Sequence, residues 1–169
     1  MATVSRNPDI KETYDHVLYG IPIALGQAIN QGDLVCWDTT ITTGGGTNGG
    51  LRVVAAQSDM AKYMGVSEQQ SPFASLGDQF YSIGIRRGGI VRLHTTASET
   101  YKMFQEVYWN ETADVQTITN GTNTGGRTVP VGYIIIPQAL VMNGVTTIVG
   151  AAGVDIQVWL TPNYPVATI

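Results

Sequence analysis

The chain has 169 residues, of which 43% are hydrophobic and only 13% charged, and its formal net charge at pH 7 is -4. A chain of this length buries roughly 70% of the surface that its unfolded form exposes, which is enough for one self-sufficient core. Charged residues are about half as frequent as in a typical soluble protein, so small polar residues must cover much of the surface. Because nucleic-acid binding draws on concentrated positive charge, the net charge argues against that partner.

Other classes of protein are disfavoured by what the sequence lacks. The single Cys36 excludes an intramolecular disulfide, and two His with one Cys offer no His-rich metal site, so no metal or cofactor is expected. No apolar run approaches the roughly 18 residues of a membrane span, so no membrane partner is expected. The N-terminus lacks the order of a secretory signal, and we expect use without export.

Taken in chain order, residues 1–19 are polar and are expected to form an extended N-terminal arm. Such an arm is either a disordered end or a strap that lies along a neighbouring subunit. From residue 20 onward, apolar residues alternate over short runs and Gly, Asn or Pro interrupts them, which predicts an all-β fold. The expected strands cover residues 21–25, 33–38, 51–57, 64–69, 80–85, 88–95, 106–111, 115–119, 127–136, 145–151 and 155–162, with short helical turns over 58–64 and 71–76.

One pattern occurs twice, as "GDLVCWD" at 32–38 and "QEVYWNE" at 105–111. Val35 and Trp37 return as Val107 and Trp109, 72 positions later. Because alternate side chains of a strand share a face, these four residues are predicted to point inward and to anchor two half-cores. The other face of the second copy is then predicted to point outward, with Glu106, Tyr108 and Asn110.

The segments that follow each copy also match. Each copy leads into a loop rich in Thr, Gly and Asn, expected to be exposed and mobile, then to a strand with a Gly step at Gly65 or Gly132. The expected closing strands are 88–95 and 155–162. The sequence therefore predicts a β domain over 20–162, a small β-barrel or β-sandwich built from two diverged units, about 20–94 and 95–162. The C-terminal segment "TPNYPVATI" at 161–169, which includes the tail 163–169, has two prolines and is not expected to pair regularly, so it is a candidate for a second strap.

Candidate chemistry is sparse. Cys36 lies beside Trp37, where burial raises a thiol pKa, so a packing role is expected. His94 shares a strand face with Arg92 and is expected to face solvent or a subunit contact. The adjacent pair Arg86 and Arg87 is expected either in a solvated hairpin turn or against an acidic patch of a partner. No enzymatic activity is expected.

A family resemblance rests on the segments "INQGDLVCWD", "KYMGVSE", "GGIVRLHT", "EVYWNE", "VPVGYII" and "DIQVWLTP". In this order they resemble the capsid decoration, or cement, proteins of tailed bacteriophages, and the resemblance covers roughly residues 20 to 162. It implies a homotrimer, made in the host cytoplasm, that binds the major capsid protein on the outer surface of the expanded head at local three-fold positions. There it would stabilise the head against internal DNA pressure. The chain is longer than the lambda-type proteins and has a doubled unit, which puts the trimer in question.

On this interpretation, the expected capsid or subunit contacts are Arg6, Lys11, His16, Arg86, Arg87, Arg92 and Trp159. The alternative is a virion-surface or tail-associated β domain that binds host glycans through polar loops and exposed aromatic residues such as Tyr101, Tyr108 and Trp159. A third hypothesis, an enzyme of β-barrel fold, would depend on His94 and Cys36.

Overall fold

The computed structural model describes residues 17–24, 26–42, 48–68, 82–111, 117–121, 127, 129–150 and 155–161. The fold is mostly β, with several sheets, which confirms the predicted fold class. Residues 1–16 of the expected arm, the central parts of both polar loops, the helical turn expected over 71–76 and the tail 163–169 lie outside the described residues.

The first unit is a five-stranded antiparallel sheet with the order β1-β5-β4-β2-β3. A parallel bridge joins Ile23, just after β1, to Leu51 on β3, and the Ala24 N–H donates to the Leu51 carbonyl at 2.9 Å. This contact brings the two outer strands together. The elements are β1 Val17–Pro22, β2 Leu34–Thr42, β3 Asn48–Val53, the 3-10 helix η1 Gln57–Lys62, β4 Tyr63–Ser67 and β5 Ser82–Arg86.

The second unit is a closed barrel, in which the strand order β6-β12-β10-β8-β9 returns to β6. The closing pair, β6 with β9, is parallel, and the Thr96 N–H donates to the Ile118 carbonyl at 2.9 Å. The strands are β6 Gly89–Thr95, β8 Glu106–Asn110, β9 Thr117–Thr119, β10 Gly132–Ile135 and β12 Asp155–Leu160.

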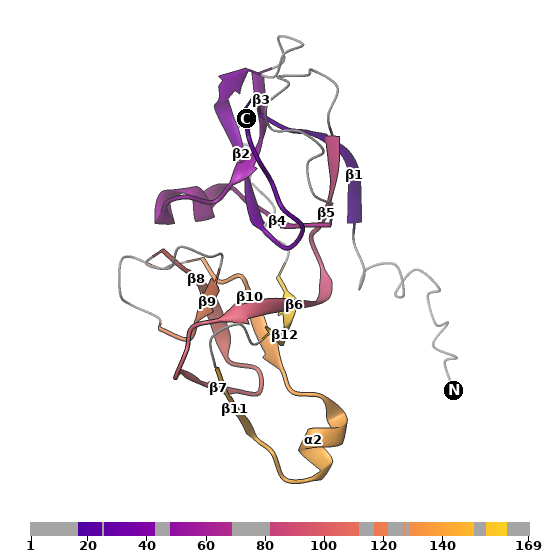
Figure 1. The fold of residues 1–169 in the computed structure, drawn as a ribbon, viewed down its shortest axis with the longest axis vertical. Coiled ribbons are helices and arrows are strands. Elements are labelled where there is room, and N and C mark those ends of the chain that lie inside the picture. Colours follow the sequence, from indigo (N-terminus) through magenta and orange to yellow (C-terminus); the bar gives the residue numbers. More distant parts are fainter. Residues whose placement is uncertain are drawn as a thin grey trace, which may run out of the picture.

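Two further strands and a helix extend the second unit. β7 (Thr100–Lys102) and β11 (Thr147–Val149) form a two-stranded sheet, and α2 (Gln138–Met142) precedes β11. These elements lie at the end of the molecule that is farthest from the first unit (Figure 1). Neither β7 nor α2 was expected from the sequence.

The two units have the same strand order and the same key pairings. Val35 pairs with Gly65 as Val107 pairs with Gly132, and the two Trp residues pair with equivalent positions on the next strand, Leu51 and Ile118. β1 therefore corresponds to β6, and β5 to β12.

This correspondence differs from the predicted division of the chain. Strand β6, expected to close the first unit, belongs to the barrel and pairs with β12 along its length. The units therefore meet at residues 87–88 instead of 94–95. Residues 17–19, assigned to the arm by their polar context, begin β1 and pair with β5. Pairing with β5 provides backbone hydrogen bonds that the local composition does not reveal.

Glycine is required where β4 and β10 approach the next strand. A Cβ on Gly65 would overlap the Arg86 carbonyl oxygen, and a Cβ on Gly132 would overlap the Trp159 carbonyl oxygen. The same contact thus occurs once in each unit, on β4 against β5 and on β10 against β12.

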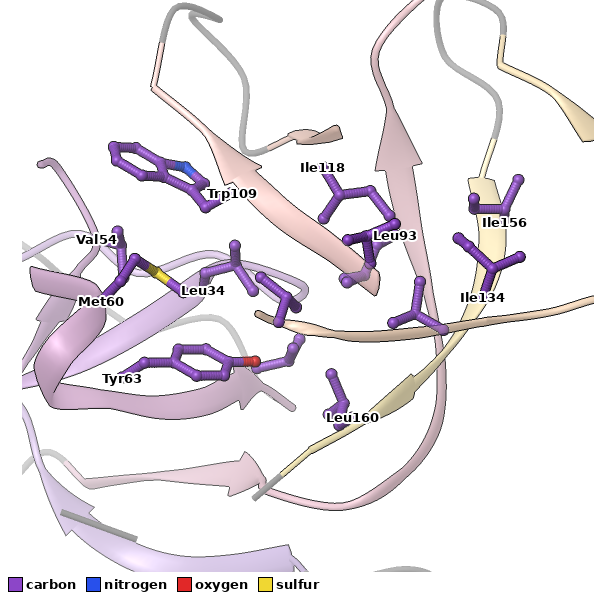
Figure 2. Close-up of a cluster of buried hydrophobic side chains, with 14 of the residues drawn as sticks. Leu34, Val54, Met60, Tyr63, Leu93, Trp109, Ile118, Ile134, Ile156 and Leu160 are labelled. Carbon is purple, nitrogen blue, oxygen red and sulfur yellow. The ribbon is translucent and has the colours of Figure 1, made fainter. Parts of the chain in front are cut away.

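Two hydrophobic clusters fill the described part of the molecule. One lies within the first unit and contains Val35 and Leu51, with Trp37 half-buried at its edge. The other is shared by both units (Figure 2), and there Val107 and Trp109 pack with residues from the first unit. Those first-unit residues are Leu34, Cys36, Val54, Met60, Tyr63 and Val66. Strand β2 is therefore buried on both faces.

The outer face of β8 is also buried, contrary to the sequence prediction. Tyr108 is only 7% exposed and Asn110 is similarly covered. Tyr108 donates to Glu106 Oε2 at 2.6 Å, and the Asn110 side chain donates to Thr96 Oγ1 at 2.8 Å. Alternation identified the faces of this strand correctly, but polar partners cover the face that was expected to meet solvent.

Replacement of Gly132 by Ala is expected to lower the free energy of unfolding by about 1–3 kcal/mol, because the new methyl group must push two paired backbones apart. Gly121→Ala is the matched control, since its Cβ would meet no backbone atom and only two side-chain atoms, an Arg127 nitrogen at 3.2 Å and the Thr119 hydroxyl at 3.4 Å. Its effect should stay within about 0.5 kcal/mol. Denaturant unfolding measures both, and equal losses would contradict the close-approach explanation.

Candidate functional site

A groove of about 580 Å³ lies between the two units and is the candidate site. Its walls come from the segment before β2, the ends of β4 and β5, and strands β6 and β12. The lining residues are Asn30, Gln31, Gly32, Asp33, Val66, Ser67, Glu68, Arg86, Ile90, Val91, Arg92, Leu93, His94 and Asp155. Because the first eight belong to one unit and the last six to the other, the groove exists only when the units are packed together.

The charged groups of the groove are mostly paired. Arg86 forms an ion pair with Glu68 on the first unit's wall. On the opposite wall His94 Nδ1 lies 2.5 Å from Asp155 Oδ1, across the β6–β12 pair. The exposed Arg92 has no ion pair within the described part of the chain. Arg92 therefore offers its guanidinium to a ligand.

Asp33 adds an acceptor at the first unit's wall. Its carboxylate accepts the Asn30 N–H at 2.7 Å, yet burial dominates and raises the pKa of Asp33 above its usual value. With Arg92 and the His94–Asp155 pair opposite, the groove presents both donors and acceptors. This arrangement suits a polar ligand that carries hydroxyl or carboxylate groups.

An exposed apolar row borders the groove on the barrel's outer wall. Trp159 on β12 pairs with Ile90 on β6 and with Tyr133 on β10. Trp159 is 40% exposed and Ile90 is 53% exposed. Trp159 was expected to make contacts outside the chain, and it remains accessible for them.

The basic residues predicted as contacts have four different outcomes. Arg92 is exposed, whereas Arg86 is half-buried and paired with Glu68. Arg87 is buried, which corrects its assignment as a surface contact. Arg86 and Arg87 do not lie in a solvated hairpin turn, because the chain crosses from the first unit to the second between β5 and β6. Arg6, Lys11 and His16 lie outside the described residues.

The aromatic residues expected to bind glycans are mostly inaccessible. Tyr101 is fully buried, and Tyr108 is nearly so. The hydrogen bond to Glu106, with burial, raises the pKa of Tyr108 to about 12. Of the three aromatic residues named for that role, Trp159 alone is accessible.

The two residues named for the enzyme hypothesis, Cys36 and His94, lie in different environments. Cys36 is fully buried in the shared core, and burial raises the pKa of its thiol to about 11. His94 is exposed on the groove wall, as expected from its strand face. The structure therefore places the thiol in a packing position.

A cluster that sequence reasoning missed lies beside β2 and η1. Arg52 donates through Nε to Asp38 at 2.6 Å and through both terminal nitrogens to Asp59 at 2.7 and 2.5 Å. Hydrogen bonds from Thr40 and then Arg52 hold the pKa of Asp38 well below its usual range, and the bond from Arg52 lowers the pKa of Asp59. Asp59 also accepts the backbone N–H groups of Ala55 and Ala56 at 2.9 Å.

A second polar cluster connects the two units. Gln57 on η1 donates to the Trp109 carbonyl at 3.1 Å and to Glu111 at 2.6 Å. Glu111 in turn accepts from Arg127 Nε at 2.9 Å, and Arg127 is buried beside Asn110. These residues are far apart in the sequence, so only the three-dimensional packing brings them together.

Within the described residues, no three His, Cys, Asp or Glu side chains gather closely enough to hold a metal ion. Among the described helices, none combines the length and apolar character that a membrane crossing requires. In comparisons with known proteins, the chain matches no family model, no curated protein and no solved structure.

Replacement of Arg52 by Gln is expected to destabilise the protein by about 1–3 kcal/mol at pH 7, because the Asp59 carboxylate loses its guanidinium donors. The folded-state pKa of Asp59 is lowered, so this stabilisation is present above the unfolded pKa of about 3.9 and is lost as pH falls through the folded pKa. The difference between wild type and Arg52→Gln should therefore narrow below about pH 4.

The measurement is denaturant unfolding at a series of pH values from 7 downward. Arg92→Gln is the matched control, since Arg92 has no ion pair within the described residues. If the difference in unfolding free energy between wild type and Arg52→Gln stays constant across acid pH, the Arg52–Asp59 interaction is not its source.

Proposed function

We propose that the protein is a structural decoration protein of a tailed-phage head, which binds the outer surface of the expanded shell. The observation that carries the proposal is that the ordered segments of the family resemblance supply β2, β4, β6, β8, β10 and β12. These strands carry the Val–Gly pairings and build the cores of both units. The resemblance therefore concerns the framework of the molecule and not a set of surface loops.

The duplicated architecture suits a partner that repeats. A capsid presents identical protein surfaces at fixed spacing, and two related units with a shared core present related surfaces at a fixed separation. A clamp of this kind stabilises the shell because it binds the expanded lattice and not the separated subunits, so its binding free energy adds to lattice stability. Many copies multiply a modest contact.

The proposal includes the major capsid protein as partner and a homotrimer at local three-fold positions. The exposed Trp159 and Arg92, on the outer faces of β12 and β6, are the described residues that best fit a capsid contact. Residues 1–16 would clasp a neighbouring subunit. The protein would be made in the host cytoplasm and would reside on the outer face of the virion.

Purified protein is expected to sediment with expanded shells and not with unexpanded ones. Trp159→Ala and Arg92→Ala should each weaken the binding to expanded shells, because they remove an aromatic anchor and an accessible cation. Lys62→Ala, at an exposed position on η1, is the control and should bind like wild type. Failure of the wild-type protein to bind either form of shell would overturn the proposal.

A second candidate function is binding of a host glycan in the groove between the units. The observation that favours it is the polar lining next to the accessible Trp159, since sugars bind through hydroxyl hydrogen bonds and stacking on an aromatic ring. On a glycan array we expect bound glycans whose signal falls in Arg92→Ala. An array without any bound glycan would contradict this function.

A further inference from the structure

The far end of the second unit carries an exposed segment without charge, next to the exposed Lys102 of β7, which pairs with Thr147. No Asp, Glu, Lys, Arg or His occurs from residue 128 to residue 154. The described part of this stretch includes α2 and β11. We call the segment from the start of α2 to the end of β11, Gln138–Val149, the tip. Its exposed apolar side chains are those of Leu140, Val141, Met142 and Val149, of which Met142 is 79% and Val149 63% exposed.

Exposure of this kind is costly unless a partner covers it. Apolar residues scattered singly over a surface are ordinary, but a group gathered on one short helix and the next strand marks an interaction site. Phe104, which is also exposed, follows β7 at the base of the tip, and its N–H donates to the Ile134 carbonyl at 2.9 Å. Phe104 therefore adds an exposed apolar side chain beside β10, the strand that leads toward the tip.

Strand β11 also leaves a backbone edge open. It pairs with β7 on one side, Ile148 opposite Tyr101, and within the described residues no strand pairs with its other side. Proteins usually protect such an edge by keeping it very short, or with Lys, Pro or a bulge. The three residues of β11 (Thr147, Ile148 and Val149) include no Lys, Pro or bulge, so the edge is short but open to an equally short strand.

The tip is held firmly enough to act as a docking surface. Tyr101 on β7 is fully buried, and its hydroxyl donates to the Ile118 carbonyl at 3.0 Å and lies 2.9 Å from Glu99 Oε2. Gly150, just after β11, donates to the Glu99 carbonyl at 2.7 Å and accepts the Ser98 N–H at 2.8 Å. Because β7 and β11 are fixed to the barrel, little ordering entropy is lost when a partner binds.

We propose that the occupant of the tip is the same tip of a second copy of this chain, with the two β11 strands antiparallel across a two-fold axis. Each copy has a net charge of -4, so two copies repel each other least where they meet through a segment without charge. A two-fold contact also requires a patch that complements itself. An uncharged apolar patch with an open strand edge satisfies this requirement, because two such edges pair directly.

The paired strands make a continuous four-stranded sheet in the order β7-β11-β11-β7, and α2 of each copy lies beside it. This contact is separate from the trimer of the proposed function, which would form on the shell, and it does not depend on capsid binding.

The test is the oligomeric state of the full chain, measured by sedimentation velocity over a range of concentrations. We expect a monomer–dimer equilibrium, and Val149→Lys should weaken it at least tenfold, since it places a charge on the edge and a like charge across the axis. Ile90→Lys, also at an exposed apolar strand position but on the barrel wall, is the matched control and should dimerise like wild type.

Met142→Glu provides a second variant in case Val149→Lys fails to fold, because Met142 is the most exposed apolar residue of the tip. A wild-type chain that stays monomeric at every concentration overturns the proposal, as does a dimer or trimer that both tip variants leave unchanged. If the tip variants lose shell binding while self-association is unaffected, the tip belongs to the capsid protein, and the second-copy assignment is overturned. If the wild-type chain dimerises as expected but does not bind shells, only the proposed function is contradicted.

Discussion

The hydrophobic cluster shared by the two units is the contact on which the rest of the structure depends. A unit of this size alone would bury only about 60% of its unfolded surface, so its stability would be marginal. Here Leu34, Met60 and Tyr63 of the first unit pack into the cluster that also holds Trp109 and Ile118 of the second (Figure 2). The groove between the units, and the distance between equivalent surfaces, follow from this packing.

Polar contacts at the same boundary fix the orientation of the two units relative to each other, which apolar packing alone would define only loosely. Gln57 reaches both the backbone of Trp109 and the side chain of Glu111, which Arg127 also holds. Because Arg127 is buried and Gln57 and Glu111 are half-buried, rotation of one unit against the other would leave donors and acceptors with unsatisfied hydrogen bonds. The shared core therefore provides most of the binding energy, and the polar contacts select one orientation.

Much of the fold was readable from the sequence because local patterns determine it. Alternation identified most strands and both Val–Trp repeats, and the helical turn expected over 58–64 is η1. The closing strand was misassigned because β5 and β6 alternate equally well, and only pairing distinguishes them. Helix α2 is too short for a helical period. The groove and the Arg52 cluster depend on residues that the packing of distant strands brings together, which no local pattern reveals.

Duplication within one chain changes how the association of the two units responds to dilution. Two separate copies of such a unit would form a dimer that comes apart as concentration falls. A short connection at residues 87–88 makes the encounter intramolecular, so each unit meets its partner at a high effective concentration in any volume. Because the two units belong to one chain, they can also differ in sequence and structure. Only the second unit has the β7–β11 sheet and α2, whereas in a dimer of identical chains both units would carry them.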